Sequence, residues 1–263
     1  MKPKMMFAVL LGSVGLMGCS PDSGKRKLII GTDATYPPFE VIDANGEFSG
    51  VSIDLGRELA KSMGREVEFR NINFDGLIAA LKSGSIDCVI SSMTANDERR
   101  KSIDFSDPYV KTGLAILVSA KSPVQGIEDL KAPERRLVVR LGTTGEQFAL
   151  KQLPGVKRVS LDSDTACVME VVNAGVDAWV YDQLSLMRYH ERHPDTTRAL
   201  LKPVQEEVWA IGIKQGNEEL KTQTNAFLKK FRADGGFTRL GEKYLAREKK
   251  MMEAQGIPFV FDL

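Results

Sequence analysis

The sequence contains few of the residues on which metal sites and common catalytic motifs depend. Its 263 residues include two histidines and three cysteines, and no cysteine has a histidine at the spacing of a metal-binding motif. No serine-triad, zinc-protease or paired-carboxylate signature is present, and the one Gly-Thr-Thr loop lacks the Walker lysine and the dinucleotide glycine spacing. These absences favour a binding protein that uses no metal, cofactor or catalytic group.

Neither sign of charge is in excess. The 36 basic and 35 acidic residues nearly cancel, and no tract rich in lysine and arginine alternates with aromatic residues. A nucleic-acid partner is therefore not expected. With 43% hydrophobic and 27% charged residues, the composition is that of a globular protein with room for two cores.

An apolar run over residues 5–17 follows two lysines at the N-terminus and is too short to span a bilayer comfortably. It leads into Leu-Met-Gly-Cys, which resembles a bacterial lipobox, although Met17 is larger than the small residue usual at its position. We expect a signal peptide over residues 1–18, lipidation of Cys19, and a flexible tether over residues 19–26. An ordinary signal peptide with an incidental cysteine, or a short membrane anchor, is the alternative.

The remaining cysteines do not suggest a disulfide. Cys88 falls in an apolar segment with strand character, whereas Cys167 falls in a helical segment far along the chain. We expect two buried structural thiols. His190 and His193 stand in a polar segment and are expected in a surface loop.

After residue 26, short apolar segments alternate with amphipathic ones, which is typical of an α/β protein. Two extended apolar segments, 113–118 and 208–213, are interpreted as crossovers between two lobes. Strands are expected over 28–32, 67–70, 86–90, 137–139, 156–159 and 178–180, and helices over 52–63, 77–83, 165–174, 218–231 and 237–244.

The segment after the strand at 86–90 has the chemistry of a carboxylate site. Ser91, Ser92 and Thr94 supply three hydroxyls at the expected carboxyl end of the strand. A short helix capped by Asn96 or its neighbour would then present an arginine, whose planar guanidinium suits a carboxylate. On spacing alone, a capped surface helix with a solvated charged face is the favoured interpretation.

The following residues favour the binding interpretation. The block Ser92-Met93-Thr94, Asn96-Asp97-Glu98-Arg99 and Asp104-Phe105-Ser106-Asp107-Pro108-Tyr109 resembles bacterial extracellular solute-binding proteins of family 3, the polar amino-acid-binding proteins of ABC importers. The similarity extends from about Lys27 to Leu245. It also includes the loop that contains Asp33 and Tyr36, Gly142-Thr143-Thr144, and Tyr181-Asp182-Gln183.

The resemblance implies a two-lobed periplasmic binding protein-like II fold. Two α/β sheets would face a ligand cleft and be joined by a two-stranded hinge. Lobe I would comprise residues 27–111 and 208–263, and lobe II residues 112–207. The protein would act as a monomer in the periplasm or another extracytoplasmic space, anchored to the membrane through Cys19.

The resemblance also implies roles for individual residues. Hydroxyls from both lobes would bind the ligand's α-carboxylate together with Arg99, and Asp182 would neutralise its α-ammonium. Tyr36 and Phe74 would stack against the stem of the ligand side chain. The full expected set is Asp33, Tyr36, Phe74, Ser91, Ser92, Met93, Thr94, Arg99, Arg140, Thr143, Thr144 and Asp182.

Asp33 and Arg140 are expected at the far end of the ligand. Asp33 alone would favour lysine or arginine, but the fixed charge of Arg140 would repel a cation. An acid and a base together could satisfy both ends of an amide, which ranks glutamine or another neutral polar amino acid first and arginine or another basic one second. If the Arg140 side chain points outward instead, arginine is expected as the ligand ahead of glutamine.

The expected function is delivery of that amino acid to the membrane permease of an ABC transporter. An enzyme on the same fold, similar to a cyclohexadienyl or prephenate dehydratase, is an alternative. It would need a general acid, and no carboxylate beyond Asp33 and Asp182 stands out in the cleft loops. A sensory ligand-binding domain and a wall-lytic enzyme are less favoured, since each would need a further segment that is not apparent.

Overall fold

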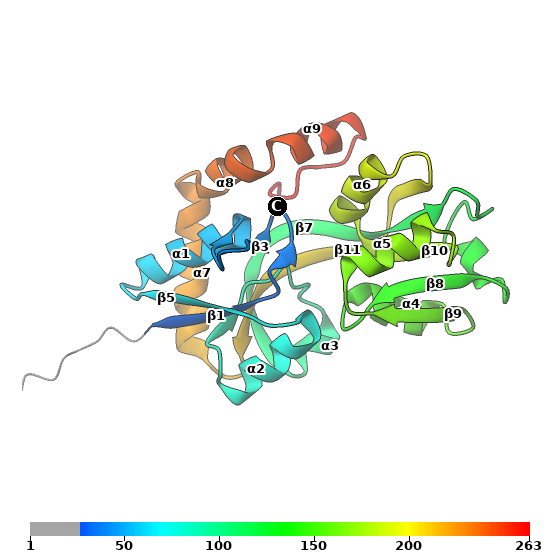
Figure 1. Ribbon diagram of the computed structural model, residues 1–263. Helices are drawn as coiled ribbons and strands as arrows, with labels where there is room; N and C mark the ends of the chain where they lie inside the picture. The colour runs from blue at the N-terminus through cyan, green and yellow to red at the C-terminus, as the bar shows by residue number, and fades with distance from the viewer. Residues whose placement is uncertain (1–26) are drawn as a thin grey trace, which may run out of the picture.

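The computed structural model describes residues 27–263, which form two lobes joined by long strands (Figure 1). The expected signal peptide, Cys19 and the tether lie outside the described residues. Within residues 27–263, no helix is both long and apolar enough to cross a membrane.

The first lobe is built on parallel strands. β1 (Leu28–Thr32) pairs with β5 (Val67–Asn71) on one side and with β6 (Cys88–Val89) on the other. A separate three-stranded antiparallel sheet contains β2 (Thr35–Tyr36), β3 (Glu40–Ile42) and β4 (Phe48–Ser49). The helical segments of this part are α1 (Val51–Ser62), η1 (Phe74–Gly76), α2 (Leu77–Ser83) and α3 (Asp97–Arg100).

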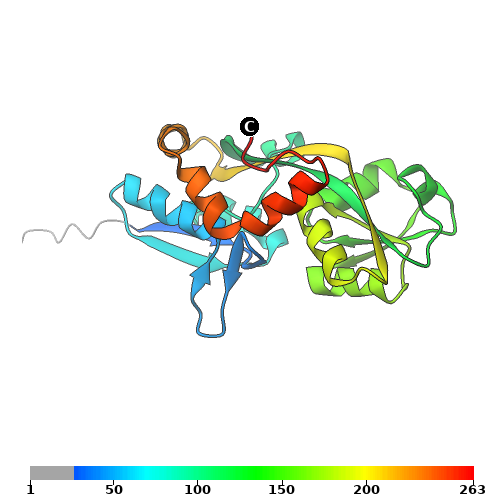
Figure 2. The same ribbon diagram turned by 90° about the horizontal axis from the view of Figure 1, so that it is seen from above.

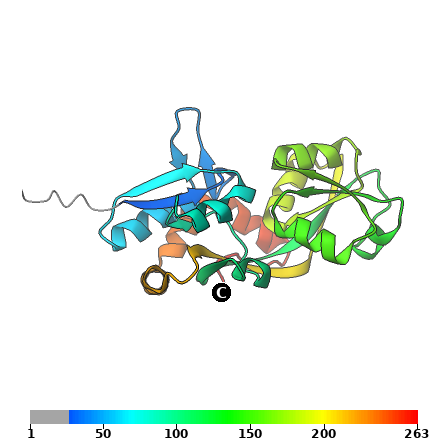
Figure 3. The same ribbon diagram turned by 90° about the horizontal axis from the view of Figure 1, so that it is seen from below.

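Two long antiparallel strands connect the lobes. β7 (Ile103–Ser119) and β11 (Thr197–Lys214) pair with each other along most of their length, with a register shift between Leu200 and Gln205. Because both strands run through both lobes, the two expected sheets join into one eight-stranded sheet with the order β5-β1-β6-β11-β7-β10-β8-β9. Figures 2 and 3 show the resulting pair of bodies from opposite sides.

The second lobe repeats the parallel arrangement. β8 (Arg136–Arg140) lies between β9 (Lys157–Leu161) and β10 (Ala178–Asp182) and is parallel to both. The helical segments here are η2 (Glu128–Lys131), α4 (Thr144–Gln152), α5 (Asp164–Val172) and α6 (Gln183–Arg192). The expected strand–helix alternation is confirmed, whereas the lobe boundaries near residues 111 and 207 stay a prediction.

The two thiols are placed as expected, whereas one of the two histidines, His190, is not. Cys88 and Cys167 are free and buried, and burial raises the pKa of each thiol to about 12. His190 is wrongly placed by the sequence, because it lies half-buried in α6, with Nδ1 3.0 Å from the hydroxyl of Thr197. The segment is polar in composition but forms a helix whose apolar side is buried.

The C-terminal segment covers the first lobe and reaches the second. α7 (Glu218–Ala233) and α8 (Gly236–Tyr244) contact α1, and α9 (Ala246–Ala254) continues from them toward α6 (Figure 2). The tail beyond α9 had no assigned role from the sequence. Its residue Val260 is buried and accepts a hydrogen bond from the Lys111 amide at 2.8 Å, so the tail helps to close the core beside the hinge.

Candidate functional site

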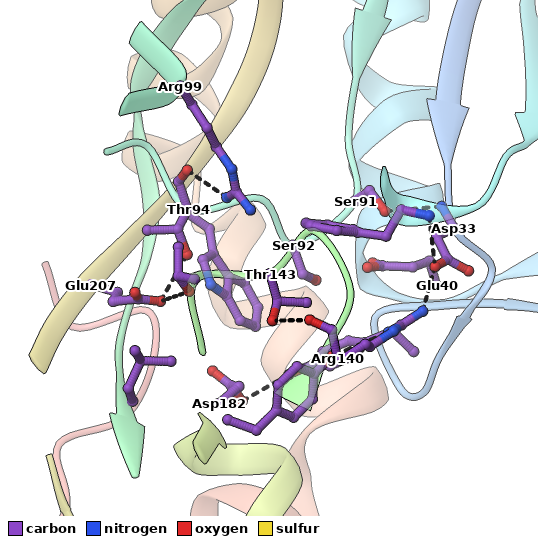
Figure 4. A pocket seen from close by; sticks show the side chains of 16 residues that line it. Asp33, Glu40, Ser91, Ser92, Thr94, Arg99, Arg140, Thr143, Asp182 and Glu207 are labelled. Carbon is purple, nitrogen blue, oxygen red and sulfur yellow. Dashed lines mark hydrogen bonds and ion pairs between the residues drawn. The ribbon is translucent and has the colours of Figure 1, made fainter. Parts of the chain in front are cut away.

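The carboxyl ends of the parallel strands in the two lobes face each other across a cleft. Polar side chains at β1 and β6 on one side and β8 and β10 on the other therefore meet (Figure 4). The empty space in the cleft is about 450 Å³, its opening to solvent included. Lining residues are Asp33, Tyr36, Glu40, Phe74, Ser91, Ser92, Thr94, Arg99, Leu114, Arg140, Thr143, Thr144, Tyr181, Asp182, Glu207 and Trp209.

The cleft brings together every residue of the expected set except Met93. The Met93 side chain is buried in an apolar cluster with Ile103 and Phe105, so it does not reach the cleft. Whether the lining residues bind a ligand stays a prediction.

Sequence reasoning missed two acidic residues in the cleft, Glu40 and Glu207. Its statement that only Asp33 and Asp182 stand out among cleft carboxylates is therefore wrong. Glu207 could have been found, because it lies two positions from Trp209 on a strand, and such residues share a face. Glu40 follows a Pro-Pro-Phe segment and carries no comparable signal.

Arg140 lies between two carboxylates. Its guanidinium is 2.5 Å from Asp33 of the other lobe and 2.8 Å from Asp164 of its own, and it donates to the Tyr181 hydroxyl at 3.1 Å. Burial opposes the charge of Arg140, but Tyr181, Asp164 and Asp33 outweigh burial, so its pKa lies above the usual value. Arg140 therefore points inward, and its charge is neutralised by the protein.

The two carboxylates that form ion pairs with Arg140 also interact with other groups of the protein. Asp33 also accepts a hydrogen bond from the Thr35 hydroxyl at 2.8 Å and from the Phe74 amide at 3.1 Å. Burial raises the pKa of Asp164 to about 6, although Arg140 opposes the shift. Asp164, which sequence reasoning did not assign to the site, supports it from α5.

Arg99 is equally buried but has different partners. Asn96 caps α3 as expected, and the Arg99 guanidinium donates to the carbonyls of Thr94 at 2.8 Å and of Gly142, in the other lobe, at 3.1 Å. Burial lowers the pKa of Arg99 to about 10, with the carboxylate of Glu207 opposing the shift. Among the described residues, no carboxylate forms an ion pair with Arg99.

Glu207 accepts hydrogen bonds from hydroxyl groups that were expected to bind a ligand. Its Oε2 accepts a hydrogen bond from Thr94 at 2.8 Å (Figure 4) and another from Thr144 at 3.0 Å. Its Oε1 accepts one from Gln205 at 2.9 Å. Burial raises the pKa of Glu207, while these hydrogen bonds oppose the shift.

Asp182 is buried at the N-terminus of α6, where its carboxylate both caps the helix and lines the cleft. Its carboxylate caps the helix by accepting from the amides of Leu184 at 3.0 Å and Ser185 at 3.1 Å. It also accepts from the hydroxyls of Tyr36 at 2.7 Å and Thr112 at 2.9 Å. Burial raises the pKa of Asp182. The bond from Tyr36 joins the two lobes across the cleft.

Glu40 is 1% exposed, and no ion pair to its carboxyl group is found among the described residues. Burial raises its pKa to about 8, with the hydroxyls of Ser52 and Ser92 opposing the shift. Glu40 therefore keeps its proton near neutral pH and contributes a neutral acid to the cleft wall.

The lobes touch at further points outside the cleft. Asn96 donates from its side-chain amide to Gln147 at 2.7 Å, next to the bond from Arg99 to Gly142. Gly142 has a positive φ of 75°, and a Cβ there would lie 3.0 Å from the backbone of Asp75 in the opposite lobe. The described conformation is therefore a closed one.

Comparison with known proteins assigns the family. Residues 28–247 match the family model of bacterial extracellular solute-binding proteins, family 3. The chain belongs to this family. Its sequence is 31% identical over 245 residues to ABC transporter arginine-binding protein 1 of Escherichia coli (strain K12), covering 92% of this chain and 98% of that protein.

Solved structures of similar proteins confirm the fold. An ancestral arginine-binding protein bound to arginine superimposes with a TM-score of 0.77 at 36% identity, covering 84% of this chain and 99% of that one. An ancestral amino acid-binding protein, described as a precursor of cyclohexadienyl dehydratase, gives 0.76 at 37% identity, covering 83% and 94%. The expected family and two-lobed fold are thus confirmed.

Proposed function

We propose that this family 3 protein is the solute-binding component of an ABC importer, which captures a polar L-amino acid as a monomer and delivers it to the permease. The observation that carries the proposal is the pairing of opposite chemistry across one closed cleft. Arg99 of lobe I presents a buried cation without an ion-pair partner among the described residues, and Asp182 of lobe II presents a buried carboxylate. Closure on a zwitterion brings both lobes into contact with it, so ligand binding favours the closed form.

The ligand's side chain is more consistent with a cation than with an amide. Arg140 is held by both Asp33 and Asp164, so it does not repel a cation, and the three groups leave one negative charge in surplus. This reverses the order expected from the sequence, and places arginine or another basic amino acid before glutamine. The arginine-binding names of the Escherichia coli relative and the ancestral structure agree with this order.

A thermal-shift screen of the twenty amino acids tests the proposal, since a ligand that binds only the folded protein raises its melting temperature. The largest shift is expected with arginine and a smaller one with glutamine. A screen in which no amino acid raises the melting temperature would contradict the proposed function.

The extracytoplasmic location includes a lipid anchor on Cys19. The lipobox-like sequence supports this proposal, although Cys19 lies outside the described residues. Mass spectrometry of the protein from its native membrane should find a mature chain that starts at an acylated Cys19. A chain that retains an unmodified Cys19 would contradict the anchor.

An enzyme on this fold is the second candidate, and Glu40 is the observation that favours it. A carboxyl group with a pKa of about 8 that lines the cleft carries a proton at neutral pH and has the character of a general acid. The ancestral neighbour described as a dehydratase precursor belongs to the same fold. Turnover of prephenate by the purified protein, lost in Glu40→Gln, would support this candidate, and absence of turnover would remove it.

A further inference from the structure

Most of the donors expected for the ligand's α-carboxylate already have partners inside the protein, although the Ser92 hydroxyl has no hydrogen-bond partner among the described residues. The hydroxyls of Thr94 and Thr144 both donate to Glu207, at 2.8 and 3.0 Å. The hydroxyl of Thr143 donates to the Arg140 carbonyl at 2.7 Å, and the Arg99 guanidinium donates to two carbonyls. Glu207 thus occupies the place of a bound carboxylate, and a ligand's own carboxylate would have to compete with it for the same hydroxyls.

Negative charge is in excess around the same cleft. Glu40 carries its proton near neutral pH because burial raises its pKa to about 8, so it adds no charge. Four other acids and two guanidiniums line or adjoin the cleft, which leaves two negative charges without a cation. These groups are the acids Asp33, Asp164, Asp182 and Glu207 and the bases Arg99 and Arg140.

We propose that the cleft binds a dicationic amine that lacks a carboxylate, such as a guanidinoalkylamine, at least as tightly as the corresponding amino acid, with Glu207 replacing the ligand's carboxylate. The inference rests on the proposed function, because it uses the same cleft and the same Asp182 for the ammonium group. It widens the ligand class from basic amino acids to their decarboxylated forms.

The physical reason is that Glu207 reduces the penalty for the missing carboxylate. A site built to hydrogen-bond a ligand group rejects analogues that lack this group, because its buried donors are then left unpaired. Here the hydroxyls of Thr94 and Thr144 stay paired with Glu207 when the ligand has no carboxylate. A dication also compensates both surplus charges, whereas arginine, with its own carboxylate, compensates only one.

Calorimetric titration of the purified protein with L-arginine and with agmatine tests the proposal directly. Agmatine carries the same guanidinobutyl group and amine but no carboxylate. A dissociation constant for agmatine equal to or lower than that for arginine supports the proposal. Weaker binding of agmatine than of arginine overturns it and leaves the proposed function intact, whereas failure of all amino acids, arginine included, counts against the proposed function instead.

Two variants separate the role of Glu207 from general effects of charge. Glu207→Gln keeps an oxygen acceptor for Thr94 and Thr144 but removes the negative charge, so agmatine should bind at least about tenfold more weakly while arginine loses less. Glu206→Gln is the matched control, because Glu206 is 75% exposed and pairs with Lys111 outside the cleft. Equal losses for both ligands in Glu207→Gln, with an unchanged melting temperature, would overturn the role assigned to Glu207.

Discussion

Two guanidiniums in the cleft, each 4% exposed, are stabilised in opposite ways. Arg140 lies between two carboxylates, which keep its pKa above the usual value despite burial. Arg99 donates only to backbone carbonyls and has a pKa lowered by burial to about 10. The charge of Arg140 therefore joins the lobes through Asp33. The charge of Arg99 is available to an anion, although the carboxylate of Glu207 acts on it electrostatically.

Replacing Arg140 should therefore have the largest effect, and on folding. Arg140→Met leaves Asp33 and Asp164 buried without their cation, so the free energy of unfolding should fall by about 3–5 kcal/mol. Urea denaturation measures it, with Arg136→Met as control, because Arg136 is an exposed residue of the same strand. A loss no greater than that of the control would show that the ion pairs do not stabilise the fold.

Arg99→Met should affect binding more than folding. Its hydrogen-bond acceptors are neutral carbonyls, so no carboxylate loses an ion-pair partner, whereas an amino-acid ligand loses the cation nearest its α-carboxylate. We expect arginine to bind about 2 kcal/mol more weakly by calorimetry and agmatine to be nearly unaffected. Arg100→Met, at an exposed position on the same helix, is the control. If affinity for arginine is unchanged, Arg99 does not contact the carboxylate.

Glu40 is a third buried ionisable group in the cleft, and it avoids a buried charge by keeping its proton. Its pKa is about 8 in the folded protein and near the ordinary value when unfolded, so the folded state binds more protons between about pH 5 and pH 8. Stability should fall as pH rises through this window, with a slope on the order of 1 kcal/mol per pH unit.

The comparison of Glu40→Gln with the wild-type protein isolates this contribution. The variant should be more stable than wild type at the upper end of the window and nearly equal at the lower end, as measured by urea denaturation across pH. Glu47→Gln changes an exposed acid in the turn after the strand that contains Glu40, and it should leave the wild-type slope intact. Parallel pH profiles for wild type and Glu40→Gln would show that Glu40 is ionised in the folded protein.

The sequence predicted most of the elements because these depend on local patterns, whereas the place of the cleft came from the resemblance to the family. Apolar periodicity located the strands and most helices, and the cap at Asn96 was correct. Contacts between residues that are far apart in the sequence leave no such local pattern. The hydrogen bond from Thr94 to Glu207 spans 113 positions, and the ion pair between Arg140 and Asp164 depends on how α5 packs against β8. Met93 was misplaced because its motif match fixes the backbone and not the direction of its side chain.

The most direct test of the account is a calorimetric titration with L-arginine of the wild-type protein and of Asp182→Asn. Asparagine can still cap α6 through its side-chain oxygen, so the variant should fold while it loses the charge that faces the ligand's ammonium. The account predicts one arginine per chain for the wild-type protein and at least about tenfold weaker binding for the variant. Equal affinity in the two proteins would contradict the claim that Asp182 holds the ammonium in the interlobe cleft.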